Sequence, residues 1–165
     1  MNRKYYLIVL GLCLFITLIG CTRQKKEEEA YREILISTGE VITKMASACI
    51  SHARSYINVR EYAQVSGEDT NTITDKILGK EYQELQAQLM ASKMKIDEFM
   101  EGLEEPSSTL VELYKKLFEL HALYSKIHTL AVSPSGSLDE YSDSINDLEN
   151  QLKELKSSLD VLHQE

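Results

Sequence analysis

The sequence has little positive charge, and this excludes one broad class of function. Its 165 residues contain 18 lysines and arginines against 26 aspartates and glutamates, which gives a formal net charge of −8. Nucleic-acid binding needs a positive surface that displaces counterions from the phosphates, so the charge balance excludes nucleic acid as a partner. It also argues against electrostatic docking to anionic lipid.

The sequence also lacks the motifs of the common enzyme and cofactor classes. It contains no paired Glu-x-x-His motif of di-iron bundles, no Cys-x-x-Cys-His, no His-Glu-x-x-His, no Gly-x-Ser-x-Gly and no glycine-rich phosphate loop. Its carboxylates are spread along the expected polar faces of helices, as on a solvated surface. We therefore predict a protein that is not an enzyme and that carries no cofactor.

Strand signals are scarce, because alternating runs and clusters of β-branched residues are few and short. Apolar residues instead recur at three- and four-residue spacing in four stretches, 31–65, 72–101, 106–132 and 137 onward. The sequence therefore predicts an all-α fold, an antiparallel four-helix bundle whose first helix is long. An intermolecular coiled coil built on the last helix is the alternative, since heptads alone do not distinguish self-packing from partner-packing.

Turn and cap residues separate these four stretches. The polar stretch 66–71 is rich in turn residues and predicts a loop. The expected helix N-caps are Thr72, Thr109 and Ser137, and the last two have a glutamate three residues later, as in a capping box.

The N-terminal residues have the features of an export signal. A positive segment, Asn2 to Lys4, precedes an apolar run over residues 5–19. Such a run is too short to span a bilayer comfortably, and a positive start with a short apolar core predicts a secretory signal peptide. It ends in Leu18-Ile19-Gly20-Cys21. This tetrapeptide resembles a bacterial lipobox, which has a branched apolar residue, a tolerant position, a small residue and then cysteine.

The resemblance implies that residues 1–20 are a cleaved lipoprotein signal peptide and that Cys21 becomes the lipidated first residue. Residues 21–30 then form a polar tether, and residues 31–165 form the bundle domain. A diacylglyceryl cysteine holds a protein durably at a membrane. Thr22, where some inner-membrane lipoproteins have aspartate, favours the outer membrane in a cell with two membranes. The alternative is an uncleaved N-terminal anchor in which Cys21 is incidental.

Three cysteines are present, and on this interpretation a single free thiol remains. Cys13 leaves with the signal peptide and Cys21 carries lipid. Cys49 then has no partner for an intramolecular disulfide, so the domain is expected to be held by packing alone.

Cys49, His52 and Tyr56 share one face of the first predicted helix, at spacings of three and four residues. They are candidate ligands for a metal ion or haem. The alternative is that His52 is a core histidine hydrogen-bonded to a tyrosine hydroxyl. We favour the core histidine, because thiolate–imidazole sites normally recruit three or four ligands.

His121 and His128 lie two turns apart beside the apolar seam of the third predicted helix. Their Cα atoms are separated by about 10 Å at 1.5 Å per residue, too far to chelate one ion without help from another helix. We predict a polar edge of the seam, with a metal site as the alternative. A haem bound by Met45 and His163, by analogy with haem-binding bundles, is a further alternative.

Together these observations predict a non-enzymatic, membrane-anchored lipoprotein of the bacterial cell envelope. It would act as an interaction or structural module whose partner is another envelope protein. The alternative function is a small-ligand, metal- or haem-binding bundle, with Cys49, His52 and Tyr56, or His121 and His128, in the pocket.

Overall fold

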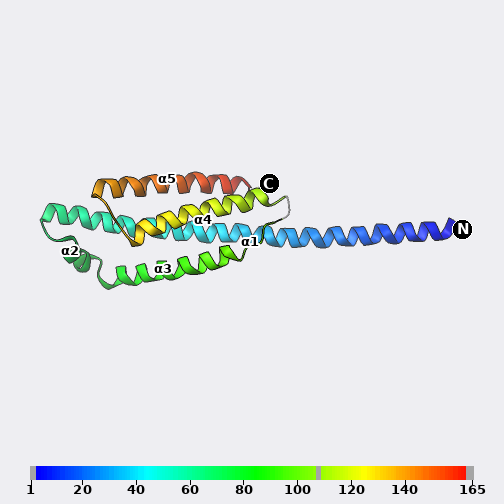
Figure 1. The fold of residues 1–165 in the computed structure, drawn as a ribbon, viewed down its shortest axis with the longest axis horizontal. Coiled ribbons are helices and arrows are strands. Elements are labelled where there is room, and N and C mark those ends of the chain that lie inside the picture. Colours follow the sequence, from blue (N-terminus) through cyan, green and yellow to red (C-terminus); the bar gives the residue numbers. More distant parts are fainter. Residues whose placement is uncertain (1–2, 107–108, 163–165) are drawn as a thin grey trace. The chain divides into compact units, whose positions relative to one another are not determined.

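The computed structural model of this protein is all-helical. It describes the backbone of residues 3–106 and 109–162 and the side chains of residues 25–106 and 109–162. These ranges contain five helices and no strand: α1 (Arg3–Ser66), α2 (Thr70–Ile77), α3 (Gly79–Glu101), α4 (Val111–Val132) and α5 (Leu138–Leu162) (Figure 1). The predicted all-α class is confirmed.

The chain divides into two compact units, Met1–Ser37 and Thr38–Glu165, and α1 contributes to both. Leu18-Ile19-Gly20-Cys21 belongs to the first unit and lies outside the residues whose side chains are described. Residues 25–30, within the stretch predicted as a polar tether, are helical and mostly exposed. The second unit holds the remaining helices and the candidate site.

Helices α1, α4 and α5 build most of the interior of the second unit, and α4 contacts α5 more extensively than it contacts α3 (Figure 1). Along α4 and α5, seams of buried residues follow the predicted spacing of three and four. The residues on these seams are Leu113, Leu117, Leu120, Tyr124, Ile127 and Ala131 in α4, and Leu138, Tyr141, Ile145, Leu148, Leu152 and Leu159 in α5; Leu123 and His128 of α4 are buried beside its seam. Burial of a large apolar side chain stabilises a fold by about 1.5–3 kcal/mol, so these seams hold the unit together.

Helix α1, from Thr38 onward, contacts each of the other long helices. Three contacts show this: the ring of His52 on Tyr82 of α3, Gly39 facing Leu117 of α4, and the ion pair of Arg54 with Glu149 of α5. The helix runs unbroken through Gly39, as predicted for the stretch 31–65.

The predicted helix over 72–101 is in fact two helices. The break falls at Gly79, whose φ of +54° lies in the left-handed region that favours glycine. The turn frees α2 to pack Ile73 against Val59 and Ala63 near the end of α1. The spacing of apolar residues alone does not reveal this break, because the spacing continues on both sides of Gly79.

Two predicted N-caps are wrong. The cap of α2 is Asp69, whose carboxylate accepts a hydrogen bond from the Thr72 backbone N–H at 3.1 Å. Thr72 is therefore a residue of the first turn. The N-cap of α4 is Leu110 rather than Thr109, and α4 begins five residues after Pro106.

The capping box at the start of α5 is confirmed. The backbone N–H of Glu140 donates to the Ser137 hydroxyl at 3.2 Å, and the N–H of Ser137 donates to the Glu140 carboxylate at 3.1 Å. These two residues satisfy donors that a helix start leaves open. The hydrogen bonds from the Ser137 backbone and hydroxyl hold the pKa of Glu140 below its usual range.

Helix α3 is the most lightly buried of the long helices in the second unit. Three of its residues are buried, Leu89, Ile96 and Met100, against eight in α4 and six in the described part of α5. Leu85 and Phe99, predicted on its buried stripe, are 39% and 47% exposed. The prediction is wrong for these two residues because other helices pack against one side of α3 only. The buried face of α3 is therefore narrower than its stripe of apolar residues.

The described part of α1, Lys25–Ser66, contains a stretch long and apolar enough to cross a membrane by length and composition. The central helix of a packed domain has the same properties. Ile42, Ala46 and Ala53 of this helix are fully buried inside the protein.

Candidate functional site

Three polar side chains lie in the interior between α1, α3 and α4, and we call them the polar core: His52, Tyr124 and His128. Their exposed fractions are 1%, 0% and 9%. Both ring nitrogens of His52, the hydroxyl of Tyr124 and Nε2 of His128 have no hydrogen-bond partner among the described residues. A buried polar atom without a partner costs about 1–3 kcal/mol. The polar core therefore opposes stability, and it is the most unusual feature of the interior.

His52 is a core histidine, but the hydrogen bond predicted to a tyrosine hydroxyl is not present among the described residues. Its ring instead stacks on Tyr82 of α3, with centroids 3.9 Å apart and planes 13° apart. Burial lowers the pKa of His52, since an imidazolium there would lose its hydration. Burial, and then the neighbouring Tyr56, raise the pKa of Tyr82 to about 12. Both rings are therefore neutral near pH 7.

Cys49 lies one turn before His52 and is fully buried. Burial raises the pKa of its thiol to about 12, so it is neither a nucleophile nor a ready metal ligand near pH 7. Tyr56 meets the ring of Tyr141 edge-on, with centroids 6.0 Å apart. The three residues predicted to share a site are thus divided, His52 facing Tyr82 and Tyr56 facing Tyr141.

His128 lies on α4 with its ring edge-on to Tyr124, the centroids 6.0 Å apart. Burial lowers the pKa of His128, and the cation of Lys93 adds to this effect. A hydrogen bond with the backbone of Leu89 and the charge of Asp97 raise this pKa, but by less than burial and Lys93 lower it. His128 is therefore a neutral imidazole facing α3.

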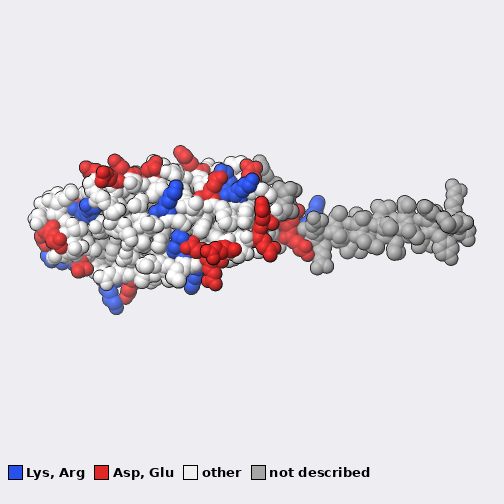
Figure 2. Space-filling view, in the orientation of Figure 1, with Lys and Arg blue, Asp and Glu red and all other residues white. Residues whose placement is uncertain are grey.

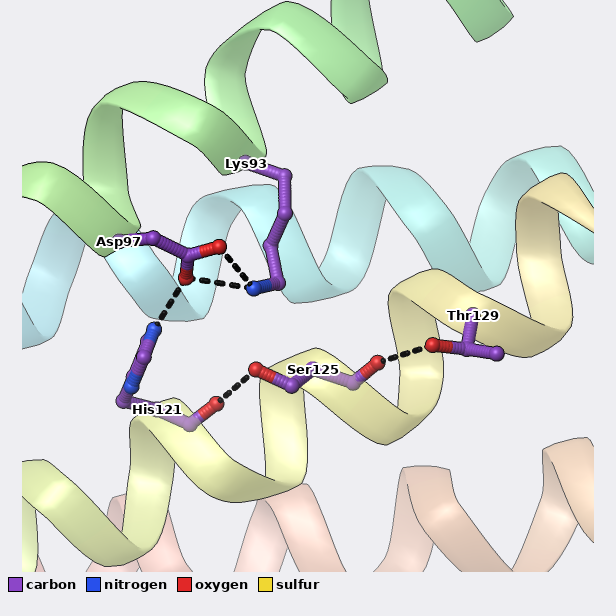
Figure 3. A network of polar contacts seen from close by, with 5 residues as sticks. All are labelled: Lys93, Asp97, His121, Ser125 and Thr129. Carbon is purple, nitrogen blue, oxygen red and sulfur yellow. Dashed lines mark hydrogen bonds and ion pairs between the residues drawn. The ribbon is translucent and has the colours of Figure 1, made fainter.

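His121 occupies a different environment, at the edge of the α3–α4 contact. Its Nε2 lies 2.6 Å from Oδ1 of Asp97, and the ammonium of Lys93 binds both oxygens of the same carboxylate (Figure 3). The side chains of His121 and Asp97 are 20% and 36% exposed. The structure therefore places His121 in a surface network and His128 in the interior, and the two do not face a common ligand.

Burial raises the pKa of Asp97, but the hydrogen bonds from Lys93 and His121 outweigh this and hold it below its usual value. Along α4, the hydroxyls of Ser125 and Thr129 each donate to the carbonyl one turn earlier at 2.9 Å (Figure 3). Each side chain of this network thus has a hydrogen-bond partner, in contrast to His52 and Tyr124 of the polar core.

The sequence analysis missed Lys93, Asp97 and Tyr82. Lys93 and Asp97 are four residues apart on one helix, which is the spacing of a helical ion pair, so a signal for them was present. Tyr82 was assigned to a buried stripe but not to His52. Its contact joins residues 30 positions apart in the sequence, which no local pattern reveals.

Within the described residues, no group of three or more His, Cys, Asp or Glu side chains is placed to hold a metal ion. His163, the second residue of the considered haem pair, lies outside the residues that the structure describes.

A positively charged groove runs between α1 and α5. Its volume is about 390 Å³. The hydroxyls of Thr43, Ser47 and Ser51 lie along its α1 side. Its charged side chains are three cations and one carboxylate, namely Arg54, Lys153, Lys156 and Glu149.

The opposite flank of α5, against α4, is acidic. Two adjoining hollows there share Lys126. Three carboxylates surround this lysine: Glu119, Asp147 and Glu154. Charges of both signs are mixed over the face shown in Figure 2, with acidic side chains along the edge where α5 begins. The hollow that continues the α1–α5 groove through Thr43 and Lys156 adds Glu40 and Asp160 against one further cation, Lys44. Helix α5 therefore has an acidic groove on one flank and, around Lys153, a local excess of positive side chains on the other.

Comparison with protein-family models, with curated proteins and with solved structures gives no match for this chain. Its function is inferred from its own residues.

Proposed function

We propose that this chain is a bacterial lipoprotein, cleaved before Cys21 and held at a membrane of the cell envelope by acyl chains on that cysteine. Leu18-Ile19-Gly20-Cys21, behind a basic and apolar leader of residues 1–20, supports this. Two or more acyl chains give durable attachment. Thr22 favours the outer membrane in a cell with two membranes.

Residues 21–30 space the domain from the lipid, and residues 31–165 form an antiparallel four-helix bundle of α1, α3, α4 and α5. The contacts of α1 with each of the other three helices support this arrangement. Helix α2 lies in the connection between α1 and α3. The apolar seam of α5 is buried within the chain, which favours the bundle over an intermolecular coiled coil.

The bundle acts as a non-enzymatic interaction module, and α5 with its two flanking grooves is the partner-binding face. The observation that carries this proposal is the positive α1–α5 groove on a chain with a net charge of −8. Opposite charge favours encounter with a matching surface and disfavours wrong partners. The occupant that fits is an acidic segment of another envelope protein. Confinement to one membrane raises its effective concentration, so a weak interface suffices.

Photo-crosslinking in intact cells tests the partner-binding face. A crosslinker at Ser47, which lines this groove on α1, should capture a protein, and Lys153→Glu with Lys156→Glu should abolish the capture. The matched control is Lys80→Glu with Lys95→Glu on α3, which makes the same charge change elsewhere and should leave capture intact. Equal capture in the wild type and the groove variant would contradict the proposed face.

Mass spectrometry of the membrane-extracted protein tests the anchor. The wild type should lack residues 1–20 and carry an acylated cysteine at its N-terminus. Cys21→Ala should release or misprocess the protein, while Cys49→Ala should be lipidated normally. A retained leader, or an unmodified Cys21, would contradict the lipoprotein assignment.

A second candidate function is a small-ligand-, metal- or haem-binding bundle, and the unpartnered atoms of the polar core favour it. Metal analysis and the absorption spectrum of the purified full chain decide between the two functions. An interaction module should contain metal well below one equivalent and show no haem band. Stoichiometric metal or haem, lost in His52→Ala or in His121→Ala with His128→Ala while the helix content stays, would establish ligand binding.

A further inference from the structure

Both buried histidines face the same helix. His52 projects from α1 and stacks on Tyr82 of α3. His128 projects from α4 and bonds the backbone of Leu89, also in α3. The three ring nitrogens left without a partner therefore all lie where α3 closes on α1 and α4.

Helix α3 is also the long helix of the second unit that is least firmly held. It begins at Gly79, whose positive φ marks a sharp turn, and its N-cap Leu78 makes no side-chain hydrogen bond. Three of its residues are buried in the core, whereas Met90 and Met94 on its outer side are 53% and 73% exposed. Helix α4 contacts α3 less extensively than it contacts α5.

We propose that α3 is an acid-sensitive flap: protonation of His52 and His128 drives it off α1 and α4 and uncovers the apolar seams beneath. A proton on either ring would create a buried cation, which is costly unless an anion pairs with it. Opening lets water hydrate both imidazolium ions. This inference goes beyond the proposed function and requires neither the lipid anchor nor a partner.

The groups around His52 provide no anion for an imidazolium. Its neighbours are Cys49 and Tyr56 on its own helix and Tyr82 on α3. Tyr141 of α5 lies beyond Tyr56. Burial raises the pKa of Cys49, Tyr82 and Tyr141, so these three groups are neutral near pH 6. Arg60, whose guanidinium lies 5.8 Å from the Tyr56 ring centroid, is a cation and cannot pair with an imidazolium.

The groups around His128 include a cation and an anion, but the anion already binds other residues. Lys93 and Asp97 face it from α3, Tyr124 from its own helix, and Cys49 of α1 lies close to Tyr124. The carboxylate of Asp97 already binds Lys93 and His121. A protonated His128 would therefore meet the ammonium of Lys93 without a free carboxylate.

The sign of the pH dependence follows from linkage. Burial lowers the pKa of both histidines in the closed state, so the open state binds more protons as the pH falls. Closure is thus complete above about pH 6.5 and is weakened below it. For histidines that stay neutral in the closed state down to pH 5.5, the opening constant should rise about 8-fold for each histidine and about 70-fold for both between pH 7.0 and 5.5.

Peptide-resolved hydrogen exchange of the full chain in detergent micelles tests this, with each rate divided by the intrinsic rate at the same pH. Protection of residues 79–101 should fall about 70-fold between pH 7.0 and 5.5, while protection of residues 138–162 changes less than 3-fold. His52→Phe keeps a stacking ring and His128→Gln keeps a donor for the Leu89 carbonyl. Each should reduce the response to about 8-fold, and the double variant should abolish it.

His121→Gln is the matched control. It also removes a histidine from α4, but one that is partly exposed and paired with Asp97, so it should retain the full response. His52→Gln replaces His52→Phe if the latter does not fold. A wild-type α3 whose protection is unchanged by acid, equal loss in α3 and α5, or a full response in the double variant would each overturn the proposal.

Discussion

The imidazole of His52 lies flat against the ring of Tyr82, with centroids 3.9 Å apart and planes inclined by 13°. This stack joins α1 to α3, at a point where the histidine nitrogens have no hydrogen-bond partner among the described residues. The contact is thus made by ring faces rather than by hydrogen bonds. It depends on the aromatic surface of Tyr82 more than on the tyrosine hydroxyl.

Substitution of Tyr82 should separate these two contributions. Tyr82→Phe keeps the stack and should change the free energy of unfolding by less than about 0.5 kcal/mol. Tyr82→Ala removes the ring and should cost about 2–3 kcal/mol, below most buried aromatic truncations because Tyr82 is only half-buried. Urea unfolding followed by circular dichroism measures both. Equal losses in the two variants would assign the stability to the hydroxyl instead.

The seam of α5 should tolerate truncation much less than its outer face. Leu152 is 5% exposed and Val161 is 58% exposed. Leu152→Ala should lower the free energy of unfolding by about 2–5 kcal/mol, because it leaves a cavity in the core. Val161→Ala, the surface control, should lower it by less than about 0.5 kcal/mol. Similar effects in both variants would mean that the α5 seam is not packed in the isolated protein.

The seams of α4 and α5 could be predicted from the sequence because each apolar residue there repeats at three or four positions and has neighbours on both sides. The buried face of α3 could not be predicted in this way, because Leu85 and Phe99 fit the same spacing but lie outside its contacts with other helices. The break at Gly79 was visible only as a helix-weakening residue. Its left-handed backbone is fixed by how α2 packs on α1.

The candidate site was predictable in composition but not in geometry. The spacing placed His52 and Cys49 on a buried face, and both are buried. The partner of His52 is a stacked ring rather than a hydroxyl, because Tyr82 reaches it from another helix. Likewise, His121 meets Asp97 across 24 positions of sequence. Such contacts are set by the angle and register between helices, which a periodic pattern does not specify.

Cys49 should resist alkylation in the folded protein. Its burial raises the thiol pKa to about 12, so the thiolate is scarce at pH 8. Iodoacetamide should therefore modify Cys49 at least about 100-fold more slowly in the native chain than in urea, where the ordinary pKa of about 8.5 returns. Peptide-resolved mass spectrometry separates Cys49 from the other cysteines. Comparable rates in the two states would show that the interior around Cys49 is open.

The final prediction concerns Asp97, which joins α3 to α4 through His121 and also binds Lys93 of its own helix. Its pKa is lowered in the folded state by the hydrogen bonds from these residues, against the raising effect of burial. A carboxyl with a lowered pKa contributes stability that is present above its unfolded pKa and is lost as the pH falls through the folded value. Asp97→Asn should therefore cost about 1 kcal/mol at pH 7, a modest figure because a partly exposed pair is screened by solvent.

At about pH 3, below the unfolded pKa of an aspartate, the difference between the wild type and Asp97→Asn should shrink toward zero. Urea unfolding at the two pH values measures this difference. Glu119→Gln is the control. Glu119 pairs with Lys116 on the exposed side of α4 and makes no interaction with α3 in the described structure. It should cost less than about 0.5 kcal/mol at pH 7. An Asp97→Asn loss of the same size at both pH values would assign the effect to packing and remove the charge network as its cause.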